Sequence, residues 1–216
     1  AVGAARQGVS VAISGDGNTA IVGGNMDNSK DGAAWVWTRT SGAWTQQGPK
    51  LVGTGAVGSE VYQGFSVALS ADGNTAIVGG NGDNNNATGA AWVWIRIGGS
   101  WTQVGGKLVG SGGVGYQNQG WSVALSADGN RAIVGGPADS SGVFGHIEGA
   151  AWVWARTGNV WTQYGPKLTA SDAVGAVVQQ GWSVALSGDG KTALVGGNHD
   201  AGQAGATWVF IDSAFT

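Results

Sequence analysis

The 216-residue sequence contains no cysteine and only three prolines. Without cysteine, neither a disulfide framework nor a thiolate metal site can form. No apolar run approaches the roughly 20 residues of a membrane helix, so we expect no membrane span. The start, AVGAARQ, has neither an initiator Met nor a signal-peptide core. Either a leader has been removed or the chain is a piece of a longer one.

Charge is also scarce. Charged residues make up 11% of the chain, whereas ordinary soluble domains contain about a quarter. The ten Lys and Arg residues are scattered and form no basic block, which argues against a nucleic-acid partner. The two histidines, His146 and His199, indicate neither a Ser-His-Asp triad nor a His-rich metal site. We therefore expect no cofactor and no metal.

Glycine, by contrast, is abundant, with 43 residues. The glycines follow no three-residue period, which excludes collagen, and instead recur at fixed offsets in a longer repeat. The four copies open with GVSVAISGDGNTAIVGG, GFSVALSADGNTAIVGG, GWSVALSADGNRAIVGG and GWSVALSGDGKTALVGG. The chain is therefore expected to be a single domain over residues 1–216, with repeats at 8–63, 64–119, 120–180 and 181–216.

Each repeat has the pattern of a four-stranded sheet. SVALS alternates with period two, an Asp-Gly hairpin signal follows, and TAIV is a second β-branched run. AAWVW and the segment that begins WTQ supply two more strands. No stretch shows capped helical periodicity, so helices should be nearly absent. Such units, repeated about every 40 to 60 residues, are typical of β-propeller blades.

The last copy stops early. It ends at Phe215-Thr216, where the first copy has Trp44-Thr45, so its fourth strand is barely begun. We expect an all-β propeller of four four-stranded blades, the last incomplete, closed as a ring with tryptophans filling the wedges between blades. The alternative is a half-ring that dimerises into an eight-bladed propeller. The open edge of the last blade is a candidate homodimer contact.

The phrases SVALSADGNTAIVGG, GAAWVW and WTQxGxKL resemble the FG-GAP, integrin-α-like repeat family, and residues 135–139 (GGPAD) are the nearest match to its Gly-Ala-Pro portion. The resemblance implies a β-propeller. It also implies an extracellular or cell-surface recognition role, because the family includes adhesion receptors, fungal lectins and uncharacterised surface proteins. The family's calcium loop is shortened here to residues 15–18 (GDGN), too few oxygens for the roughly six to eight ligands of Ca²⁺.

Most of the 13 carboxylates occupy equivalent places in the repeats. The hairpin positions are Asp16, Asp72, Asp128 and Asp189, and the positions in the following loop are Asp27, Asp83, Asp139 and Asp200. Copies of one turn residue favour local backbone hydrogen bonding over an acid-base pair. We therefore expect no enzymatic activity.

Two sets of residues are candidates for ligand binding. The first set is the polar loop after the second strand, with Asn25, Asp27, Asn81, Asp83, Asp139, Asn198 and Asp200. The second set is the position after the linker glycine, which is Val9 in the first repeat and Phe65, Trp121 and Trp182 in the others. The structural interpretation is turn chemistry for the first set and core filling for the second. The functional interpretation is a repeated site in which amides, carboxylates and aromatic rings bind sugar hydroxyls.

Three functions remain open. The first is a non-enzymatic, multivalent, lectin-like module that binds carbohydrate. The second is a protein-interaction or structural domain of a larger secreted or surface protein, so the partner is a glycan or a protein. A hydrolase with a site in the central channel ranks third.

Overall fold

The computed structural model describes residues 1–85, 88–140 and 145–213, which form antiparallel sheets that follow the sequence repeats. The first sheet contains β1 (Ser10–Ile13), β2 (Thr19–Gly24), β3 (Ala33–Thr40) and β4 (Ala43–Gln46). The second contains β5 (Ser66–Leu69), β6 (Thr75–Gly80), β7 (Ala90–Ile97) and β8 (Ser100–Gln103). The third contains β9 (Ser122–Leu125), β10 (Arg131–Gly136), β11 (Ile147–Thr157) and β12 (Val160–Gln163). The last contains β13 (Val177–Leu186), β14 (Thr192–Gly197) and β15 (Ala206–Ile211). A short parallel pairing of β13 with β11 makes the third and last sheets continuous, as one seven-stranded sheet.

Helices contribute little to the described residues. They are the four-residue α1 (Asp27–Lys30) and α2 (Asp200–Gln203), which occupy equivalent loops of the first and last repeats. The expectation that helices are nearly absent is confirmed for this part of the chain. None of its helices is long and apolar enough to cross a membrane.

The expected hairpin between the first two strands of each repeat is confirmed. In the first repeat, Asp16 Oδ1 accepts hydrogen bonds from the Ser14 hydroxyl at 2.5 Å and from the Asn18 backbone N–H at 2.9 Å. Gly17, at φ +68°, takes the left-handed position of the turn. Asp72, Asp128 and Asp189 accept the same pair of bonds in the other repeats. These aspartates therefore build the turns.

Successive sheets pack face to face through apolar side chains. In the first interface, Ile21 and Val36 of the first sheet lie in one cluster with Val78 and Trp92 of the second. Equivalent clusters join the second sheet to the third and the third to the last. The innermost strands β1, β5, β9 and β13 lie side by side in that order. As expected for core residues, Trp92 and its counterpart Trp152 are fully buried.

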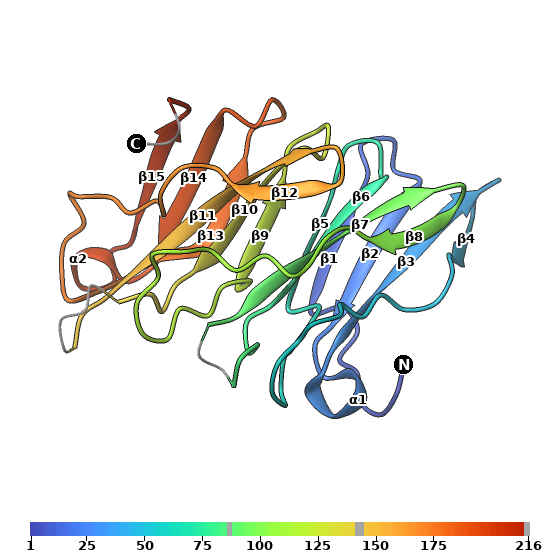
Figure 1. The fold of residues 1–216 in the computed structure, drawn as a ribbon, viewed down its shortest axis with the longest axis horizontal. Coiled ribbons are helices and arrows are strands. Elements are labelled where there is room, and N and C mark those ends of the chain that lie inside the picture. The colour runs from blue at the N-terminus through green and yellow to red at the C-terminus, as the bar shows by residue number, and fades with distance from the viewer. Residues whose placement is uncertain (86–87, 141–144, 214–216) are drawn as a thin grey trace.

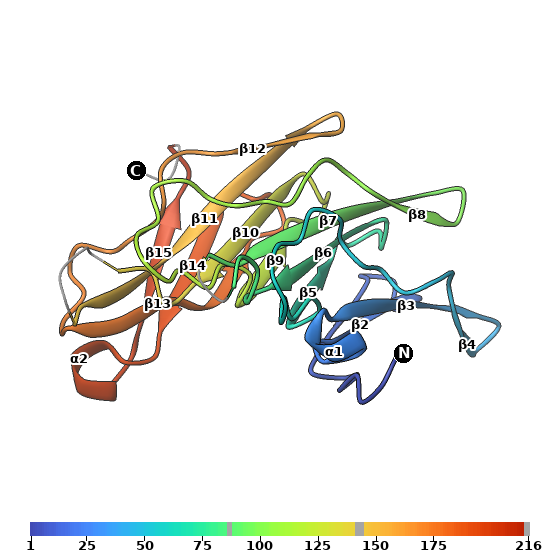
Figure 2. The same ribbon diagram turned by 60° about the horizontal axis from the view of Figure 1, so that its bottom comes forward.

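The array of sheets is open within this chain. Figures 1 and 2 show the first sheet near one end of the molecule and the last sheet at the other, with the two termini far apart. No apolar cluster of the described residues joins these two sheets. The expected ring of four blades closed within one chain is therefore not observed. Among the described residues, the clusters that cross from one sheet to another join sheets that are neighbours along the sequence.

The hairpin aspartates predict a loss of stability in acid. The hydrogen bond from Ser14, followed by those from Asn18, lowers the pKa of Asp16 from 3.8 to about 2. The corresponding bond from Ser187 lowers the pKa of Asp189. A carboxyl whose pKa is lower in the folded state adds stability above its unfolded-state pKa, and this contribution disappears as the pH falls through the folded-state value.

We therefore expect the urea midpoint of the protein to fall between about pH 4 and about pH 2. The fall should be smaller in Asp16→Asn, because that variant has one fewer carboxyl to protonate. Urea unfolding at a series of pH values measures both midpoints. Parallel pH profiles for the two proteins would contradict the assignment.

Candidate functional site

The loop aspartates are buried beneath the surface. Asp83 Oδ1 accepts a hydrogen bond from the Val57 backbone N–H at 2.7 Å, and its Oδ2 forms an ion pair with Lys107. The equivalent pairs are Asp27 with Lys50 and Asp139 with Lys167. Each aspartate thus ties the inter-blade linker and the end of its own blade to the loop. Asp27, Asp83 and Asp139 thus have structural partners within the chain.

Asp200 occupies the same position in the last repeat. Its Oδ1 accepts a hydrogen bond from the Val174 backbone N–H at 2.6 Å, and the residue is buried. No lysine pairs with it within the described part of the chain. Asp200 therefore keeps the linker contact of its three counterparts without their ion pair. We leave all four aspartates out of the ligand site.

The aromatic candidates form a continuous ladder across three sheets. The ring centroids of Phe65 and Trp121 lie 4.8 Å apart, and those of Trp121 and Trp182 lie 4.7 Å apart. The rings are tilted by 49° and 45°, which is a favourable aromatic arrangement. Trp182 is exposed at the end of the ladder. The structure thus brings together three residues that are more than 50 positions apart in sequence.

A hollow of about 240 Å³ lies between the first and second sheets beside Phe65. The other residues that line it are Arg6, Asn25, Met26, Lys30, Tyr62 and Asn81. Asn25 is 7% exposed and Asn81 is 8% exposed, yet the Oδ1 atom of neither has a hydrogen-bond partner among the described residues. A buried acceptor left unpaired costs about 1–3 kcal/mol, so a polar group that enters the hollow would be stabilised there.

The same region holds a repeated backbone strain. Arg6, Tyr62, Asn118 and Gln179 each lie two residues before a linker glycine, with φ of 53°, 60°, 54° and 61°. Non-glycine residues at positive φ are uncommon and cluster at ligand-binding sites. Gln179 Oε1 is another buried acceptor with no partner in the described residues. Sequence reasoning missed this position, although its variation before a constant Gln-Gly pair was a usable signal.

Two charged groups at the hollow, Lys30 and Glu60, form an ion pair. Glu60 accepts hydrogen bonds from Lys30 at 2.5 Å and from the Tyr62 hydroxyl at 2.8 Å. The bond from Lys30, followed by that from Tyr62, lowers the pKa of Glu60, and the bond to Glu60 raises the pKa of Lys30. Both groups are therefore charged at neutral pH and offset each other. The pair also holds the Tyr62 ring at the rim.

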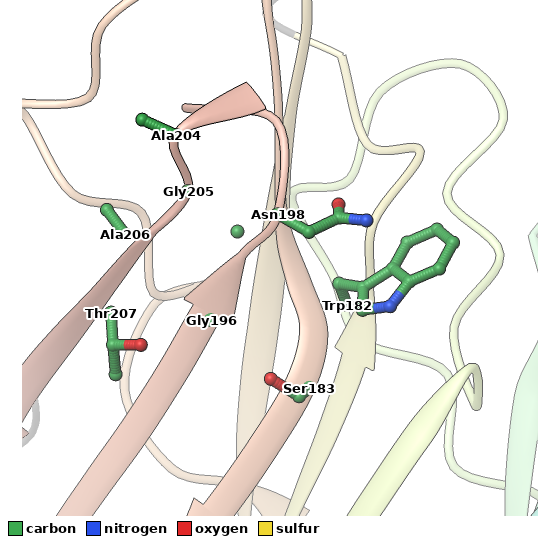
Figure 3. Close-up of a pocket in the computed structure, with 9 residues that line it drawn as sticks. Trp182, Ser183, Gly196, Asn198, Ala204, Gly205, Ala206 and Thr207 are labelled. Atoms are coloured by element: carbon green, nitrogen blue, oxygen red, sulfur yellow. The ribbon is translucent and has the colours of Figure 1, made fainter. Parts of the chain in front are cut away.

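Asn198 lies near the far end of the ladder. It lines a second hollow together with Trp182, on the last sheet (Figure 3). We name as the end surface three variable positions of each repeat: the residue after the linker glycine, the residue two before that glycine, and the residue after the second strand. It comprises Val9, Phe65, Trp121, Trp182, Arg6, Tyr62, Asn118, Gln179, Asn25, Asn81, Pro137 and Asn198.

The described residues contain no group of three or more His, Cys, Asp or Glu side chains placed to hold a metal ion. The groups available to a ligand on the end surface are amides, aromatic rings and the Arg6 guanidinium. Their chemistry is that of binding by hydrogen bonds and stacking.

Comparison with known proteins defines the fold class. No protein-family model and no curated protein sequence matches the chain. Hydrazine synthase of Kuenenia stuttgartiensis is similar in structure, with a TM-score of 0.53 and 15% identity over 98% of this chain and 47% of that one. TolB from Acinetobacter baumannii gives a TM-score of 0.49 and 11% identity over 94% of this chain and 40% of that one.

The chain therefore spans less than half the length of these two structures. The likeness to hydrazine synthase, at its low identity, concerns the fold alone. Together with the repeated antiparallel sheets it defines an all-β, propeller-type fold.

Because the loop aspartates are buried in ion pairs, substitution of a paired lysine should markedly lower the free energy of unfolding. Lys107→Met leaves the buried carboxylate of Asp83 without its cation, which should lower the free energy of unfolding by about 2 kcal/mol. Lys30→Met, which breaks the half-exposed pair with Glu60, should cost less than about 1 kcal/mol. Urea unfolding of both variants tests the difference, and equal losses would contradict it.

Proposed function

We propose that this protein is a non-enzymatic recognition module of the secreted or surface-exposed type, which binds carbohydrate on its end surface. The proposal depends on one observation: the buried Oδ1 atoms of Asn25 and Asn81, which have no hydrogen-bond partner among the described residues, lie at a hollow beside an aromatic ladder. The resemblance to FG-GAP repeats, a family that includes lectins and adhesion receptors, is consistent with this role.

The chemistry of the hollow suits a neutral polyol. Sugar hydroxyls donate hydrogen bonds to amide oxygens, and the C–H face of a sugar ring packs on an aromatic ring such as Phe65. The nearby charges of Lys30 and Glu60 already offset each other. A pocket for a drug-sized molecule is about 300–1,000 Å³. The hollow of about 240 Å³ therefore suits a smaller group such as one sugar ring.

The repeat extends the same chemistry along the array. Trp182 and Asn198 lie together on the last sheet as Phe65 and Asn81 do on the second. Several weak sites on one rigid scaffold gain strength by avidity when the ligand is itself repetitive. We propose that the four repeats are propeller blades, the last with three strands in the described residues, and that together they form an arc that displays these sites.

A protein-interaction role is the second candidate. It is favoured by the apolar side chains that the two terminal sheets expose, among them Val11 on β1 and Val209 on β15. Hydrolysis in a central channel has the least support, because the repeated aspartates accept hydrogen bonds from their own turns and linkers. The two leading candidates use different surfaces, so they are separable by experiment.

The carbohydrate proposal predicts that Asn25→Ala weakens glycan binding without lowering stability. Loss of one hydrogen bond to a sugar hydroxyl should weaken binding about tenfold. Stability should hold, because the substitution removes a buried acceptor that has no partner in the described residues. A neutral-oligosaccharide array, followed by calorimetric titration with the best-bound oligosaccharide, measures affinity. Thermal unfolding measures stability.

Asn159→Ala is the matched control, since Asn159 is an exposed asparagine in the hairpin between β11 and β12. It should bind as the unsubstituted protein does. If no oligosaccharide binds, the carbohydrate proposal is wrong. If Asn25→Ala lowers stability and leaves binding intact, Asn25 has a structural role.

A further inference from the structure

The three internal contacts between neighbouring sheets repeat one hydrogen bond. A serine at the start of the inner strand donates its hydroxyl, at 2.8 Å each time, to the linker-glycine carbonyl of the next sheet. The pairs are Ser10 with Gly64, Ser66 with Gly120, and Ser122 with Gly181. We call this contact and the apolar packing around it the joint.

Each joint brings together two different faces. The forward face of a sheet packs on the next sheet in the chain, and in the second sheet it includes Ile77 and Val93, both 0% exposed. The rear face packs on the preceding sheet, and there it includes Val67, which is also buried. At the internal joints a forward face therefore packs on a rear face.

The forward face of the last sheet is uncovered. Leu194 and Val209, which occupy the positions of Ile77 and Val93, are 40% and 60% exposed. Beside them lies an open hollow of about 550 Å³ whose lining includes Ser183, the counterpart of the joint serines (Figure 3). In the internal joints, the carbonyl of the next linker glycine occupies this place. The hollow is thus half of a joint.

The rear face of the first sheet is uncovered as well. Val11, which corresponds to the buried Val67, is 68% exposed. A Cβ built on Gly64 would lie 2.2 Å from the carbonyl oxygen of Ala33 in the preceding sheet, but a Cβ built on Gly8 meets no atom within 4 Å. Gly8 nevertheless has the left-handed backbone of its counterparts, with φ of +95°. The first sheet therefore presents the other half of the joint, with Gly8 in the backbone conformation that the joint glycines have.

We propose that the forward face of the last sheet binds the rear face of the first sheet in a second copy of this chain. Ser183 then donates its hydroxyl to the Gly8 carbonyl of the second copy, and Leu194 and Val209 pack against its Val11. The second copy is the occupant because both halves of the joint are present on one chain, at opposite ends of the array.

Two copies joined at both ends close into a ring with twofold symmetry. Repeat arrays need polar terminal faces to stay soluble when nothing covers them. The exposed valines and leucine of these two faces are instead covered in the ring. The interface covers the hollow that Trp182 and Asn198 line, so it shares this one hollow with the proposed glycan sites, but its formation requires no glycan.

Light scattering across a dilution series tests the interface. We expect a mass of twice the 21.5 kDa of the chain, independent of concentration well above the dissociation constant. Val209→Asp and Val11→Asp should each reduce the mass to that of one chain. Ile97→Asp is the control, because Ile97 is equally exposed but lies on β7, away from both faces, and it should leave the doubled mass unchanged. Circular dichroism should show all three variants folded.

Mixing the two defective variants then tests whether the contact joins a forward face to a rear face. Val209→Asp retains a working rear face and Val11→Asp a working forward face, so a tagged copy of one should capture the other, whereas neither captures itself. An unsubstituted protein that stays at 21.5 kDa at every concentration, or a mixture that does not associate, would overturn the proposal. Masses that keep growing with concentration would overturn the closed pair.

Discussion

The close approach of neighbouring sheets at the linker glycines is the constraint on which the structure depends. A Cβ on Gly79 would lie 2.2 Å from the carbonyl oxygen of Gly120, and one on Gly64 would lie as close to that of Ala33. A side chain at either place would separate the sheets and break the serine hydrogen bond that joins them. The joint therefore requires glycine at the same offsets in successive repeats, which is why the repeat is so rich in this residue.

The same joint places the residues that vary. The residue after each linker glycine stands at the end of an inner strand, so Phe65, Trp121 and Trp182 stack across sheet boundaries once the glycines have brought the sheets together. Asn25 and Asn81 follow the glycine pairs of the second strands. A constant framework of glycine, serine and valine thus carries a variable end surface.

The loop aspartates show where sequence reasoning was incomplete. Their spacing indicated either a turn residue or a ligand-binding residue, and both interpretations were consistent with an Asn-rich loop. The structure shows that Asp83 is buried with Lys107, which lies 24 positions away, and with the Val57 backbone. The lysine was visible in the KL phrase of each of the first three repeats. Its pairing required knowledge of how the fourth strand returns to the loop.

By itself the sequence determined the repeats, the period-two strands, the Asp-Gly hairpins and the tryptophan-rich core, because these follow from local spacing and turn chemistry. Only the tertiary structure showed which faces of successive sheets pack together, since these contacts join residues of different repeats. The tertiary structure was also needed to show that the buried Oδ1 atoms of Asn25 and Asn81 lack hydrogen-bond partners among the described residues. Whether a buried polar atom has a hydrogen-bond partner depends on its neighbours in space, and those neighbours come from different repeats.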